Sequence, residues 1–252
     1  KTKLKSGDVY QVNYTYPQLF KTNDDIFDIF YYLSQVSKPQ FGWYIDIESV
    51  QILCFSPERF FKTKDDKIYS NPIKGTMPRS DNIDLDNDYK KKLKNSIKDK
   101  AENLMITDLI RNDLGKICKY GSINVDEIFK IVSFQTVHHM ISKVSGDLKS
   151  DISEIDIIKA LFPGGSITGA PKESAMKIID NLENYSREIY TGSIGYIKSN
   201  GNMDFNIAIR TMINKNGILK YPVGGGIVWD SKSDQEWEET KTKTKILYSI
   251  IE

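Results

Sequence analysis

The end of the chain carries three charged side chains whose types and spacing could bind a metal ion and an anion. Glu236, Glu239 and Lys243 are three and four residues apart, so a helix would carry them on one face. Two carboxylates on one face can hold a hard divalent cation, and a lysine one turn away can bind an anion. A salt-bridged, solvent-exposed helix face explains the same three residues when they are taken alone. Glu102 is a further candidate ligand, because it lies beside the apolar stripe of a predicted helix, where a carboxylate needs a partner.

A lysine and a glutamate in two loop-like segments could supply covalent and acid–base chemistry. Lys74 lies in PIKGT, where proline and glycine predict a rigid corner, and Glu58 lies in SPER. A lysine fixed near a carboxyl group could act as a nucleophile with a neighbouring acid or base. Most loop lysines only face solvent, and the spacing leaves open whether these two residues meet.

Two further features could hold carboxylates. Gly224, Gly225 and Gly226 follow a predicted strand, and their bare backbone N–H groups could approach an anion, although a triple glycine also marks a sharp bend. Arg210 is predicted to lie in a strand among apolar residues, where a guanidinium needs an anion. A bidentate substrate carboxylate and a structural ion pair both satisfy that need, so the sequence leaves the choice open.

The elements that must position these residues show no internal repeat and no linker-like segment. Apolar spacing predicts helices over residues 24–37, 86–114, 153–161, 172–185 and 233–251. Alternation and turn residues predict strands over residues 8–16, 41–47, 50–55, 59–63, 67–70, 125–132, 137–146, 191–198, 203–213 and 218–223. This order predicts an α+β fold with largely antiparallel sheets and argues against a doubly wound parallel sheet.

Composition narrows the class of protein. The chain has 252 residues, 39% hydrophobic and 27% charged, with a net charge of +1, so nothing indicates nucleic acid or an anionic membrane as a partner. No apolar run approaches the roughly 18 residues of a membrane helix. The two cysteines and two adjacent histidines lack zinc-site spacing. Two cysteines in a chain of this length suit a reducing cytoplasm, although one disulfide is not excluded. Because the first residue is Lys1, we expect an upstream segment in the natural protein.

Ten short motifs occur along the chain in a fixed order. They are GDVYQVNYT, FSPERFF, NPIKGTMPR, ENLMITDLIRNDLG, VHHMISKVSGDL, FPGGSITGAPKESA, REIYTGSIGY, NIAIRTM, GGGIVWDS and EWEETKTK. Together they resemble the chorismate-utilising enzymes, a family that includes aminodeoxychorismate, anthranilate, isochorismate and salicylate synthases. The resemblance implies a chorismate-binding catalytic domain over residues 1–252. It also implies the family fold, an anthranilate-synthase-component-I-like arrangement of two large, mostly antiparallel sheets packed with crossing strands. In that fold the helices lie outside and the active site lies in the cleft.

The resemblance also implies roles for individual residues. Glu102 and Glu239 resemble the family's Mg²⁺ ligands, with Glu236 beside them, and the metal would hold the ring carboxylate of chorismate. The same carboxylate would be bound by Lys243 and by the backbone of Gly224, Gly225 and Gly226. The other implied substrate-binding residues are Arg210 and Tyr190 for the enolpyruvyl carboxylate, His139 near the ring and the leaving hydroxyl, and Ser166 and Thr168 in the GSITGAPK loop.

Two positions indicate which chorismate reaction the resemblance favours. Gln11 replaces the lysine that isochorismate and salicylate synthases use as a water-activating base, and glutamine cannot act as one. Lys74 stands in PIKGT where anthranilate synthases read PIAGT, and this lysine resembles the one in enzymes that aminate chorismate at C4. Neutral Lys74 would attack C2 while Glu58 protonates the leaving hydroxyl, and ammonia would then attack C4.

The implied partners and the alternatives complete the hypothesis. The chain has no glutaminase triad, so the ammonia would come from a glutamine amidotransferase subunit or from free ammonium. The product, 4-amino-4-deoxychorismate, would feed p-aminobenzoate and folate synthesis after a separate lyase step. Anthranilate synthase component I is the alternative within the family. A non-catalytic homologue that only binds chorismate or a partner is the alternative outside enzymes.

Overall fold

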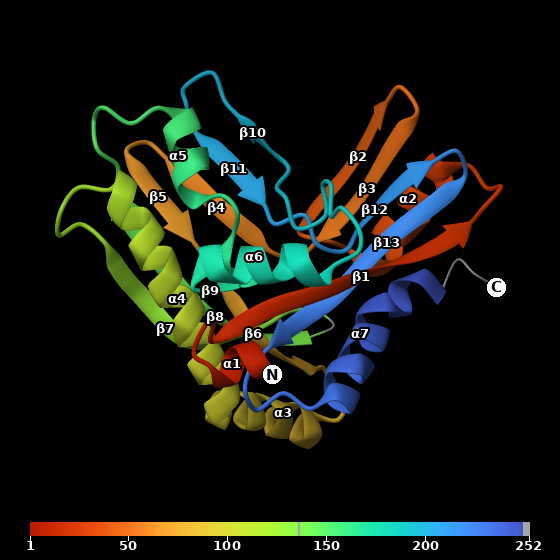
Figure 1. Cartoon of the computed structure of the whole chain (residues 1–252), viewed down its shortest axis with the longest axis horizontal. Coiled ribbons are helices and arrows are strands. Elements are labelled where there is room, and N and C mark those ends of the chain that lie inside the picture. The colour runs from red at the N-terminus through yellow and green to blue at the C-terminus, as the bar shows by residue number, and fades with distance from the viewer. Residues whose placement is uncertain (136, 249–252) are drawn as a thin grey trace. The chain divides into compact units, whose positions relative to one another are not determined.

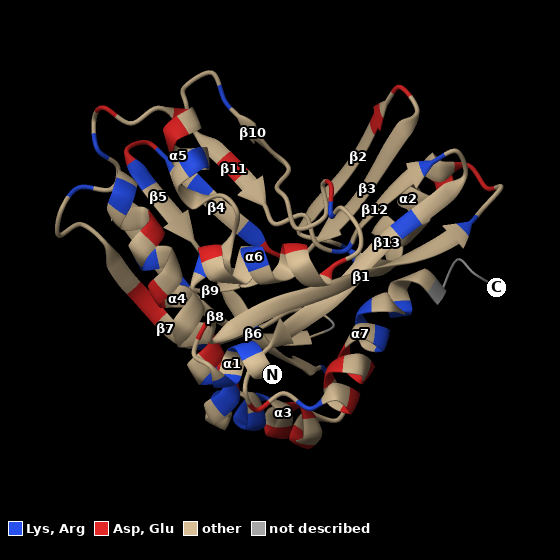
Figure 2. Cartoon of the chain, in the orientation of Figure 1, with Lys and Arg blue, Asp and Glu red and all other residues tan. Residues whose placement is uncertain are grey.

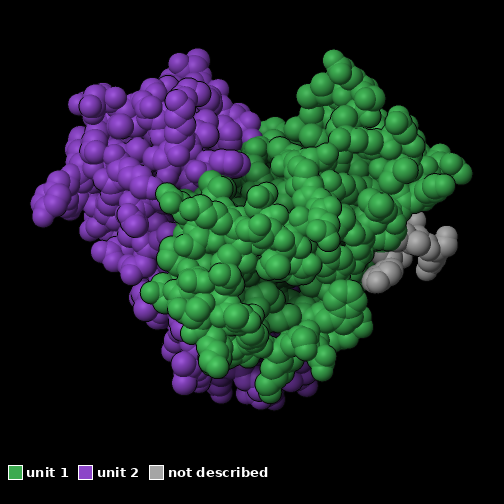
Figure 3. Space-filling view, in the orientation of Figure 1, with its two compact units in different colours: residues 1–58, 163–194, 206–252 green, residues 59–162, 195–205 purple. Residues whose placement is uncertain are grey.

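Two antiparallel sheets organise the chain, and each sheet belongs to its own unit. The computed structural model describes residues 1–135 and 137–248. One unit contains Lys1–Glu58, Pro163–Ile194 and Asn206–Glu252, and the other contains Arg59–Phe162 and Gly195–Phe205 (Figure 3). Each unit is thus assembled from segments that lie far apart in the sequence. The predicted α+β class with antiparallel sheets is confirmed.

The sheet of the first unit has six strands in the order β2-β3-β12-β13-β1-β9 (Figure 1). Its strands are β1 (Gln11–Lys21), β2 (Phe41–Ile47), β3 (Val50–Ser56), β9 (Gly169–Ala170), β12 (Thr211–Lys215) and β13 (Ile218–Ile227). Its helices are α1 (Thr2–Lys5), α2 (Ile26–Ser37), α6 (Lys172–Leu182), α7 (Ser233–Tyr248) and the short 3-10 helix η1 (Gly165–Ile167). The long antiparallel pair β1–β13 is central, because α6 packs against β1 and α7 against β13.

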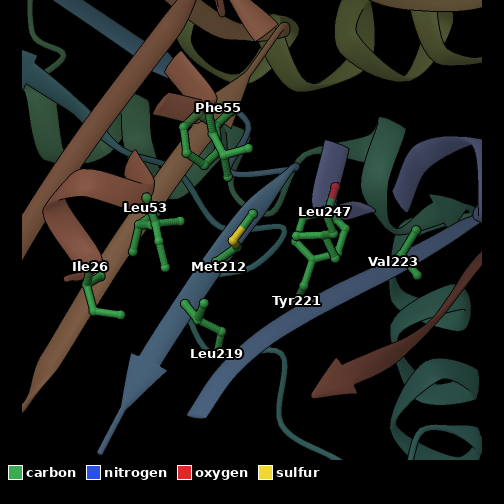
Figure 4. Close-up of a cluster of buried hydrophobic side chains, with 10 residues drawn as sticks. Ile26, Leu53, Phe55, Met212, Leu219, Tyr221, Val223 and Leu247 are labelled. Atoms are coloured by element: carbon green, nitrogen blue, oxygen red, sulfur yellow. The ribbon is translucent and has the colours of Figure 1, made fainter. Parts of the chain in front are cut away.

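The core of the first unit joins α2 and α7 to the strands β3, β12 and β13. Its ten buried side chains, eight of which are labelled in Figure 4, are Ile26, Ile29, Leu33, Leu53, Phe55, Met212, Leu219, Tyr221, Val223 and Leu247. In α2 the buried residues recur at spacings of three and four, whereas Phe27 and Tyr31, which belong to the apolar pattern that predicts this helix, are exposed. Asp25 begins the helix, since its carboxylate accepts the backbone N–H groups of Phe27 and Asp28.

The sheet of the second unit has seven strands. Six follow the order β10-β11-β4-β5-β8-β6, and β7 also pairs with β8. The strands are β4 (Arg59–Lys64), β5 (Lys67–Ser70), β6 (Ile73–Pro78), β7 (Asn124–Ser133), β8 (Val137–Asp147), β10 (Gly195–Ile197) and β11 (Met203–Asn206), and the helices are α3 (Ile83–Asn95), α4 (Ile97–Ile117) and α5 (Glu154–Leu161). Helices α4 and α5 bury their apolar faces with β4, β5, β8 and β11. The buried residues of this core are Phe61, Ile68, Leu114, Ile117, Cys118, Val144, Ile157, Leu161 and Met203.

The single helix predicted over residues 86–114 is wrong. The segment forms α3 and α4, which meet at Ser96. Ser96 has an extended backbone, and its hydroxyl accepts the N–H of Asp99 at 3.2 Å, so it ends one helix and caps the next. Apolar periodicity continues across the junction because both helices bury one face, and periodicity alone therefore misses the break.

The strand predicted over residues 203–213 is also wrong as a single element. Its first part is β11 of the second unit and its last part is β12 of the first unit. The segment between them contains Arg210, whose φ of +50° cannot belong to a regular strand. Both parts are buried, which makes the apolar run continuous in the sequence. Gly224, Gly225 and Gly226 differ from expectation as well, because they lie inside β13 and form no bend.

Candidate active site

In the first unit, charged side chains of α7 converge on one glycine of β13. A Cβ atom placed on Gly225 would lie 3.5 Å from Glu236 Oε2, 3.7 Å from Glu239 Oε1 and 3.7 Å from Lys243 Nζ. Lys243 Nζ also lies 2.6 Å from Glu239 Oε1 and donates to the carbonyl oxygen of Gly224 at 2.8 Å. The three side chains that helical spacing groups on one face do come together. The missing side chain at Gly225 leaves space directly in front of them.

This cluster has the ligand chemistry of a magnesium site. Two carboxylates reach one small space, and Mg²⁺ characteristically takes one or two protein carboxylates together with water and substrate oxygens. Across residues 1–135 and 137–248, no three His, Cys, Asp or Glu side chains are grouped to hold a metal ion. Figure 2 shows acidic and basic residues in close succession along α7, and Lys243 balances the charge of Glu239. The residues therefore fit a cation that completes its coordination with oxygens from a ligand.

Gln11 approaches the same run of glycines from β1. A Cβ atom on Gly226 would lie 2.9 Å from Gln11 Nε2, and Gln11 is fully buried, with no hydrogen-bond partner for either amide atom among the described residues. Burying such an unpaired group costs roughly 1–3 kcal/mol. The Gln11 amide is therefore a candidate contact for a bound ligand. Gly224 serves a different purpose, since a Cβ atom there would lie 2.1 Å from the carbonyl oxygen of Tyr14.

Glu58 and Ser166 meet although 108 residues separate them. Ser166 Oγ donates to Glu58 Oε1 at 3.0 Å. The backbone of Glu58 is fixed on both sides, because its N–H donates to Ser56 Oγ at 3.2 Å and its carbonyl accepts from Ile207 N at 3.0 Å. With 9% of Glu58 exposed, its carboxyl group is held nearly out of water. A carboxyl group placed in this way, beside a hydroxyl, can serve as a positioned acid or base.

The loop that carries Ser166 is braced from within. Thr168 Oγ1 donates to the carbonyl oxygen of Gly164 at 2.9 Å, and the carbonyl oxygen of Thr168 accepts from Asn13 N at 2.8 Å. The hydroxyl of Thr168 is thus engaged inside the loop. Its predicted contact with a substrate stays a prediction, and its visible contribution is to the conformation around Ser166.

Arg210 and the residue that follows Tyr190 lie at backbone positions that few residues adopt. Thr191, which follows Tyr190, has a φ of +61°, and Arg210 has a φ of +50°. Backbone hydrogen bonds hold both, from Thr191 N to Ala208 O at 2.9 Å and from Phe55 N to Arg210 O at 3.0 Å. Such conformations are costly for residues other than glycine and cluster at functional sites. Burial raises the pKa of the Tyr190 phenol, so its hydroxyl stays neutral and able to donate to a carboxylate.

In the second unit, Lys74 lies on a β-bulge of β6 rather than at the predicted corner. The pairing of β6 with β8 shifts by one residue between Ile73 and Thr76, so Lys74 and Gly75 together face a single residue of β8. Gly75 has a φ of +82°, and a Cβ atom there would lie 2.9 Å from the side chain of Asp99. Only glycine fits this position. The bulge changes the direction of the Lys74 side chain relative to a regular strand.

His139 lies across from this bulge. Its Nδ1 is 2.9 Å from Thr76 Oγ1, and its ring meets the ring of Phe134 edge-on at 5.5 Å between centroids. His139 is buried, with 7% of its surface exposed. The threonine hydroxyl and the aromatic ring thus fix the orientation of the imidazole on the strand next to Lys74.

Glu102 is placed by the residue that follows it in α4. Asn103 is fully buried, and its Nδ2 donates to the carbonyl oxygen of Met140 at 3.3 Å. This bond fixes the helix to β8 at the residue after His139. The Glu102 side chain is 17% exposed, and its Oε1 lies 3.8 Å from Lys98 Nζ. Glu102 therefore belongs to the junction of α4, β6 and β8 that also carries Lys74.

The residues singled out by the sequence fall into two groups, one in each unit. The first unit holds Glu58, Ser166, Thr168, Tyr190, Arg210, Gly224, Gly225, Gly226, Glu236, Glu239 and Lys243, and the second unit holds Lys74, Glu102 and His139. Direct contacts join Glu58 to Ser166, and the α7 cluster surrounds the space above Gly225. Their assigned roles toward a substrate remain predictions.

Sequence patterns did not single out Arg187 and Glu183, which form a buried ion pair beside the Ser166 loop. Arg187 Nη2 lies 2.6 Å from Glu183 Oε1, and the two side chains are 14% and 2% exposed. Two signals were available. The pair has the i, i+4 spacing of a helix, and Gln11, Asn13 and Thr15 put three buried polar residues on one face of β1.

The adjacent histidines also differ from a simple strand pattern. Successive side chains of a strand point to opposite faces, and here both His138 and His139 are buried. His138 Nε2 lies 2.8 Å from Asp86 Oδ1 of α3, which covers this part of β8. The Arg79 guanidinium, whose Nε is 2.8 Å from the same oxygen, holds the pKa of Asp86 well below its usual range. The Asp86–His138 contact therefore belongs to a structural network that also includes Arg79.

Both cysteines are free and buried. Burial raises the pKa of the Cys54 thiol and raises that of Cys118 to about 11. Neither has the depressed pKa of a reactive thiolate. Within the part of the chain that the structure describes, no helix is long and apolar enough to cross a membrane.

Comparison with curated proteins identifies close relatives. The chain is 43% identical to aminodeoxychorismate synthase component 1 of Escherichia coli over 249 residues, which are 99% of this chain and 55% of that protein. It is 38% identical to anthranilate synthase component 1 of Saccharolobus solfataricus over 248 residues, which are 98% of this chain and 59% of that protein. The chain therefore spans little more than half the length of these relatives.

A solved structure and a family model agree with these relatives. The anthranilate synthase component I of Streptococcus pneumoniae superposes with a TM-score of 0.89 at 32% identity, covering 97% of this chain and 55% of that one. Residues 1–249 match the family model for a chorismate binding enzyme. Because the match extends over nearly the whole sequence, the chain belongs to the family of chorismate binding enzymes.

Proposed function

We propose that this chain is the catalytic part of an enzyme that aminates chorismate at C4 to give 4-amino-4-deoxychorismate. The product would serve p-aminobenzoate and folate synthesis after a lyase step. Identity of 43% to aminodeoxychorismate synthase component 1 of E. coli supports this reaction. The observation that carries the proposal is the position of Lys74 on the β6 bulge, next to the strand of His139, which supports its role as the reactive group.

The proposed binding mode uses the charges of both groups of residues. Arg210 and Tyr190 bind the enolpyruvyl carboxylate, while Lys243 and the glycine backbone of β13 bind the ring carboxylate. Glu102 and Glu239, with Glu236, would hold Mg²⁺, which when bound acts as a Lewis acid toward the ring carboxylate. The open space at Gly225, bounded by Glu236, Glu239 and Lys243, supports the placement of that carboxylate.

The proposed chemistry proceeds in two displacements. The neutral amine of Lys74 attacks C2, both conjugated ring double bonds shift, and the C4 hydroxyl leaves as water with a proton from Glu58. Ammonia then attacks C4, both double bonds shift back, and the Lys74 amine leaves C2. His139 lies near the leaving hydroxyl and orients it. Ser166 orients Glu58, a role supported by the 3.0 Å hydrogen bond between them.

Gln11 supports amination over hydration. A carboxamide cannot remove a proton from water, so direct attack of water at C2 lacks a base at this position. The Gln11 amide is buried and has no partner within residues 1–135 and 137–248, which favours a contact with substrate or with ammonia.

We further propose that ammonia is supplied by a glutamine amidotransferase subunit and that the protein works in the cytoplasm. The name of the E. coli relative, component 1, implies a second component for that protein. Neither Cys54 nor Cys118 is suited to glutamine hydrolysis, because burial raises the pKa of each thiol. Two unpaired cysteines suit a reducing compartment.

Anthranilate synthesis is the second candidate. The chain is 38% identical to anthranilate synthase component 1 of S. solfataricus. The two reactions differ in where the amino group enters the ring and in whether pyruvate is lost. Lys74 is the residue that favours C4 amination. A protein that binds chorismate without turnover is a third alternative, which any product excludes.

Product identification tests the proposal directly. The protein, in its natural length, is incubated with chorismate, Mg²⁺ and ammonium at mildly alkaline pH, with and without an aminodeoxychorismate lyase. We expect p-aminobenzoate by mass spectrometry only when the lyase is present. Anthranilate formed without the lyase would assign the second candidate function. Absence of turnover with chorismate bound would assign the third.

A further inference from the structure

A buried guanidinium links β1 to the segments that carry Ser166 and Tyr190. Arg187 follows α6, and its side chain is 14% exposed. It donates through Nε to Glu183 Oε2 at 2.7 Å and through Nη2 to Glu183 Oε1 at 2.6 Å. This is the two-pronged geometry of a strong arginine–carboxylate pair.

The remaining donors of Arg187 reach the backbone of two other segments. Nη2 donates to the carbonyl oxygen of Asn13 at 2.6 Å, and Nη1 donates to the carbonyl oxygen of Ile167 at 2.9 Å. Nη1 also lies 3.4 Å from Thr191 Oγ1. An arginine side chain has five N–H donors. All five have an acceptor here, so Arg187 has no donor left for a substrate carboxylate.

Glu183 is satisfied in the same way. Besides the guanidinium, its Oε1 accepts the backbone N–H and the hydroxyl of Thr15, each at 2.8 Å. The Thr15 hydroxyl lies 2.5 Å from the hydroxyl of Tyr185. The pair therefore connects β1, the Ser166 loop and the segment of residues 185–191 into one buried polar network.

The bond to Ile167 is the one that concerns catalysis. Ile167 lies between Ser166 and Thr168, and its carbonyl oxygen accepts from both Arg187 Nη1 and Asn13 Nδ2. The adjacent hydroxyl, Ser166 Oγ, donates to Glu58 Oε1. The direction of the Ser166 side chain thus depends on a backbone carbonyl that the guanidinium fixes.

The geometry points to Arg187, held by Glu183, as a positioning residue that aligns Ser166 and through it the acid Glu58. This inference rests on the proposed role of Glu58 as the acid for the leaving hydroxyl. The substrate carboxylates are assigned to Arg210 and Lys243, which Arg187 does not contact in the described structure. Loss of the alignment should therefore slow the reaction of bound chorismate more than it weakens chorismate binding.

Arg187→Lys is the informative variant. Lysine keeps the positive charge beside Glu183 but cannot form the planar fork that also reaches Asn13 and Ile167. We expect kcat to fall about 100-fold, because a displacement of about 1 Å at a reacting group has that effect, while the KM for chorismate changes less than about 3-fold. A rise in KM without a fall in kcat would overturn the inference.

The double variant Arg187→Lys/Ser166→Ala tests the connection between the two residues. If Arg187 acts through Ser166, the double variant is no slower than the slower single variant, because the effects of coupled residues do not add. Effects that multiply would show that Arg187 acts by another path. Leu33→Ala, in the buried core of α2, is the control for general destabilisation, measured well below both melting temperatures. A loss of kcat as large in the control would also overturn the inference.

Hydrogen exchange separates this inference from the proposed function. A wild-type protein that forms no 4-amino-4-deoxychorismate would contradict the proposed function, yet the Arg187 network can still be measured. We expect Arg187→Lys to raise amide exchange in a peptide covering residues 163–170 by about 10-fold, with no such local change in Leu33→Ala. Glu183→Gln, which removes the charge that holds the guanidinium, should act in the same direction. Unchanged exchange in this peptide in both variants would overturn the positioning role.

Discussion

The two units hold their candidate site residues in different ways. In the first unit a buried polar network and constrained backbone fix the positions, with Arg187 using five donors and Thr191 and Arg210 at positive φ. In the second unit an irregular strand does so, with Lys74 and Gly75 on a bulge and Thr76 bonded to His139.

This difference indicates a division of labour. The residues of the first unit have chemistry suited to binding and orienting an acid: two carboxylates, a lysine, an arginine and an acid held by Ser166. The second unit contributes the single side chain proposed to form a bond, Lys74. Substitutions in the first unit should weaken substrate binding or alignment only in part. Removal of Lys74 should remove a chemical step.

Lys74→Ala should have the largest effect. Without the amine, no covalent adduct can form at C2, and we expect 4-amination to fall by roughly 1,000-fold or more, as for loss of a nucleophile. The measurements are the rate of p-aminobenzoate formation in the lyase-coupled assay and the intact mass of the protein trapped with chorismate. The adduct mass should appear in wild type only.

Lys64→Ala is the matched control for this prediction. Lys64 is an exposed lysine at the end of β4 in the same unit, and its removal should leave the rate unchanged. An amination rate of Lys74→Ala within about 10-fold of the wild-type rate would contradict the proposed difference between the units. No chemical step would then depend on the lysine of the second unit.

Glu239→Gln and Glu102→Gln should have the next largest effects. Each removes one charge from the proposed Mg²⁺ ligands, one in each unit, and we expect activity at fixed Mg²⁺ to fall by roughly 100-fold, as for a lost electrostatic contact in the transition state. Titration of activity with Mg²⁺ should show a higher half-saturating concentration in both variants.

Glu238→Gln provides the control for the α7 carboxylates. Glu238 is adjacent to Glu239, but its side chain is 67% exposed and pairs with Lys241 at 2.6 Å. Its Mg²⁺ titration should match wild type. If only Glu239→Gln altered the Mg²⁺ titration, Glu102 would be removed from the metal shell and cation binding would belong to the first unit alone.

Gly225→Ala should have a moderate effect on binding. The added methyl group would meet Glu236, Glu239 and Lys243 only at 3.5–3.7 Å, so the folded protein tolerates it. It would, however, fill the space proposed for the ring carboxylate. We expect an unchanged melting temperature and a KM for chorismate raised about 10-fold, equal to about 1.4 kcal/mol of binding.

Gly224→Ala sharpens the interpretation of its neighbour. Its Cβ atom would lie 2.1 Å from the carbonyl oxygen of Tyr14, so it should lower the melting temperature by disrupting the β1–β13 pair. An unchanged KM in a stable Gly225→Ala protein would mean that the glycine at 225 serves packing, as at 224, and that the first unit binds the carboxylate elsewhere.

Sequence patterns predicted the parts of the structure that repeat locally. The helix expected over residues 24–37 is α2, Phe41–Ile47 was expected as a strand and is β2, and the α7 carboxylates fell on one face. The α+β class followed from the order of elements. These features depend on periodicity within one segment, which a single sequence displays.

Long-range pairing determined what the sequence patterns missed. Lys74 was expected at a corner because PIKGT contains proline and glycine, whereas pairing with β8 makes it a bulge in a strand. The run over residues 203–213 contains a change of sheet, and Arg210 with its positive φ lies between the two strands. The Arg187–Glu183 pair was missed because its other acceptors, Asn13 and Ile167, are distant in sequence.

Gln11→Met should give the smallest effect and the clearest contrast between folding and function. The Gln11 amide is fully buried, and no group in the described protein pairs with it. Replacing it with an apolar side chain of similar length removes two unsatisfied atoms, so we expect the free energy of unfolding to rise by about 1 kcal/mol in urea denaturation. Amination should fall nonetheless, because the lost amide is proposed to contact substrate or ammonia.

Gln18→Met, on the same strand but only half-buried, is the control and should change neither the free energy of unfolding nor the amination rate. A protein destabilised by Gln11→Met would show that the amide is satisfied in solution, by water or by a rearranged side chain. The Gln11 amide would then not be available to bind a ligand. Of the features proposed to bind substrate in the first unit, the α7 cluster would remain the one that distinguishes it from the second unit.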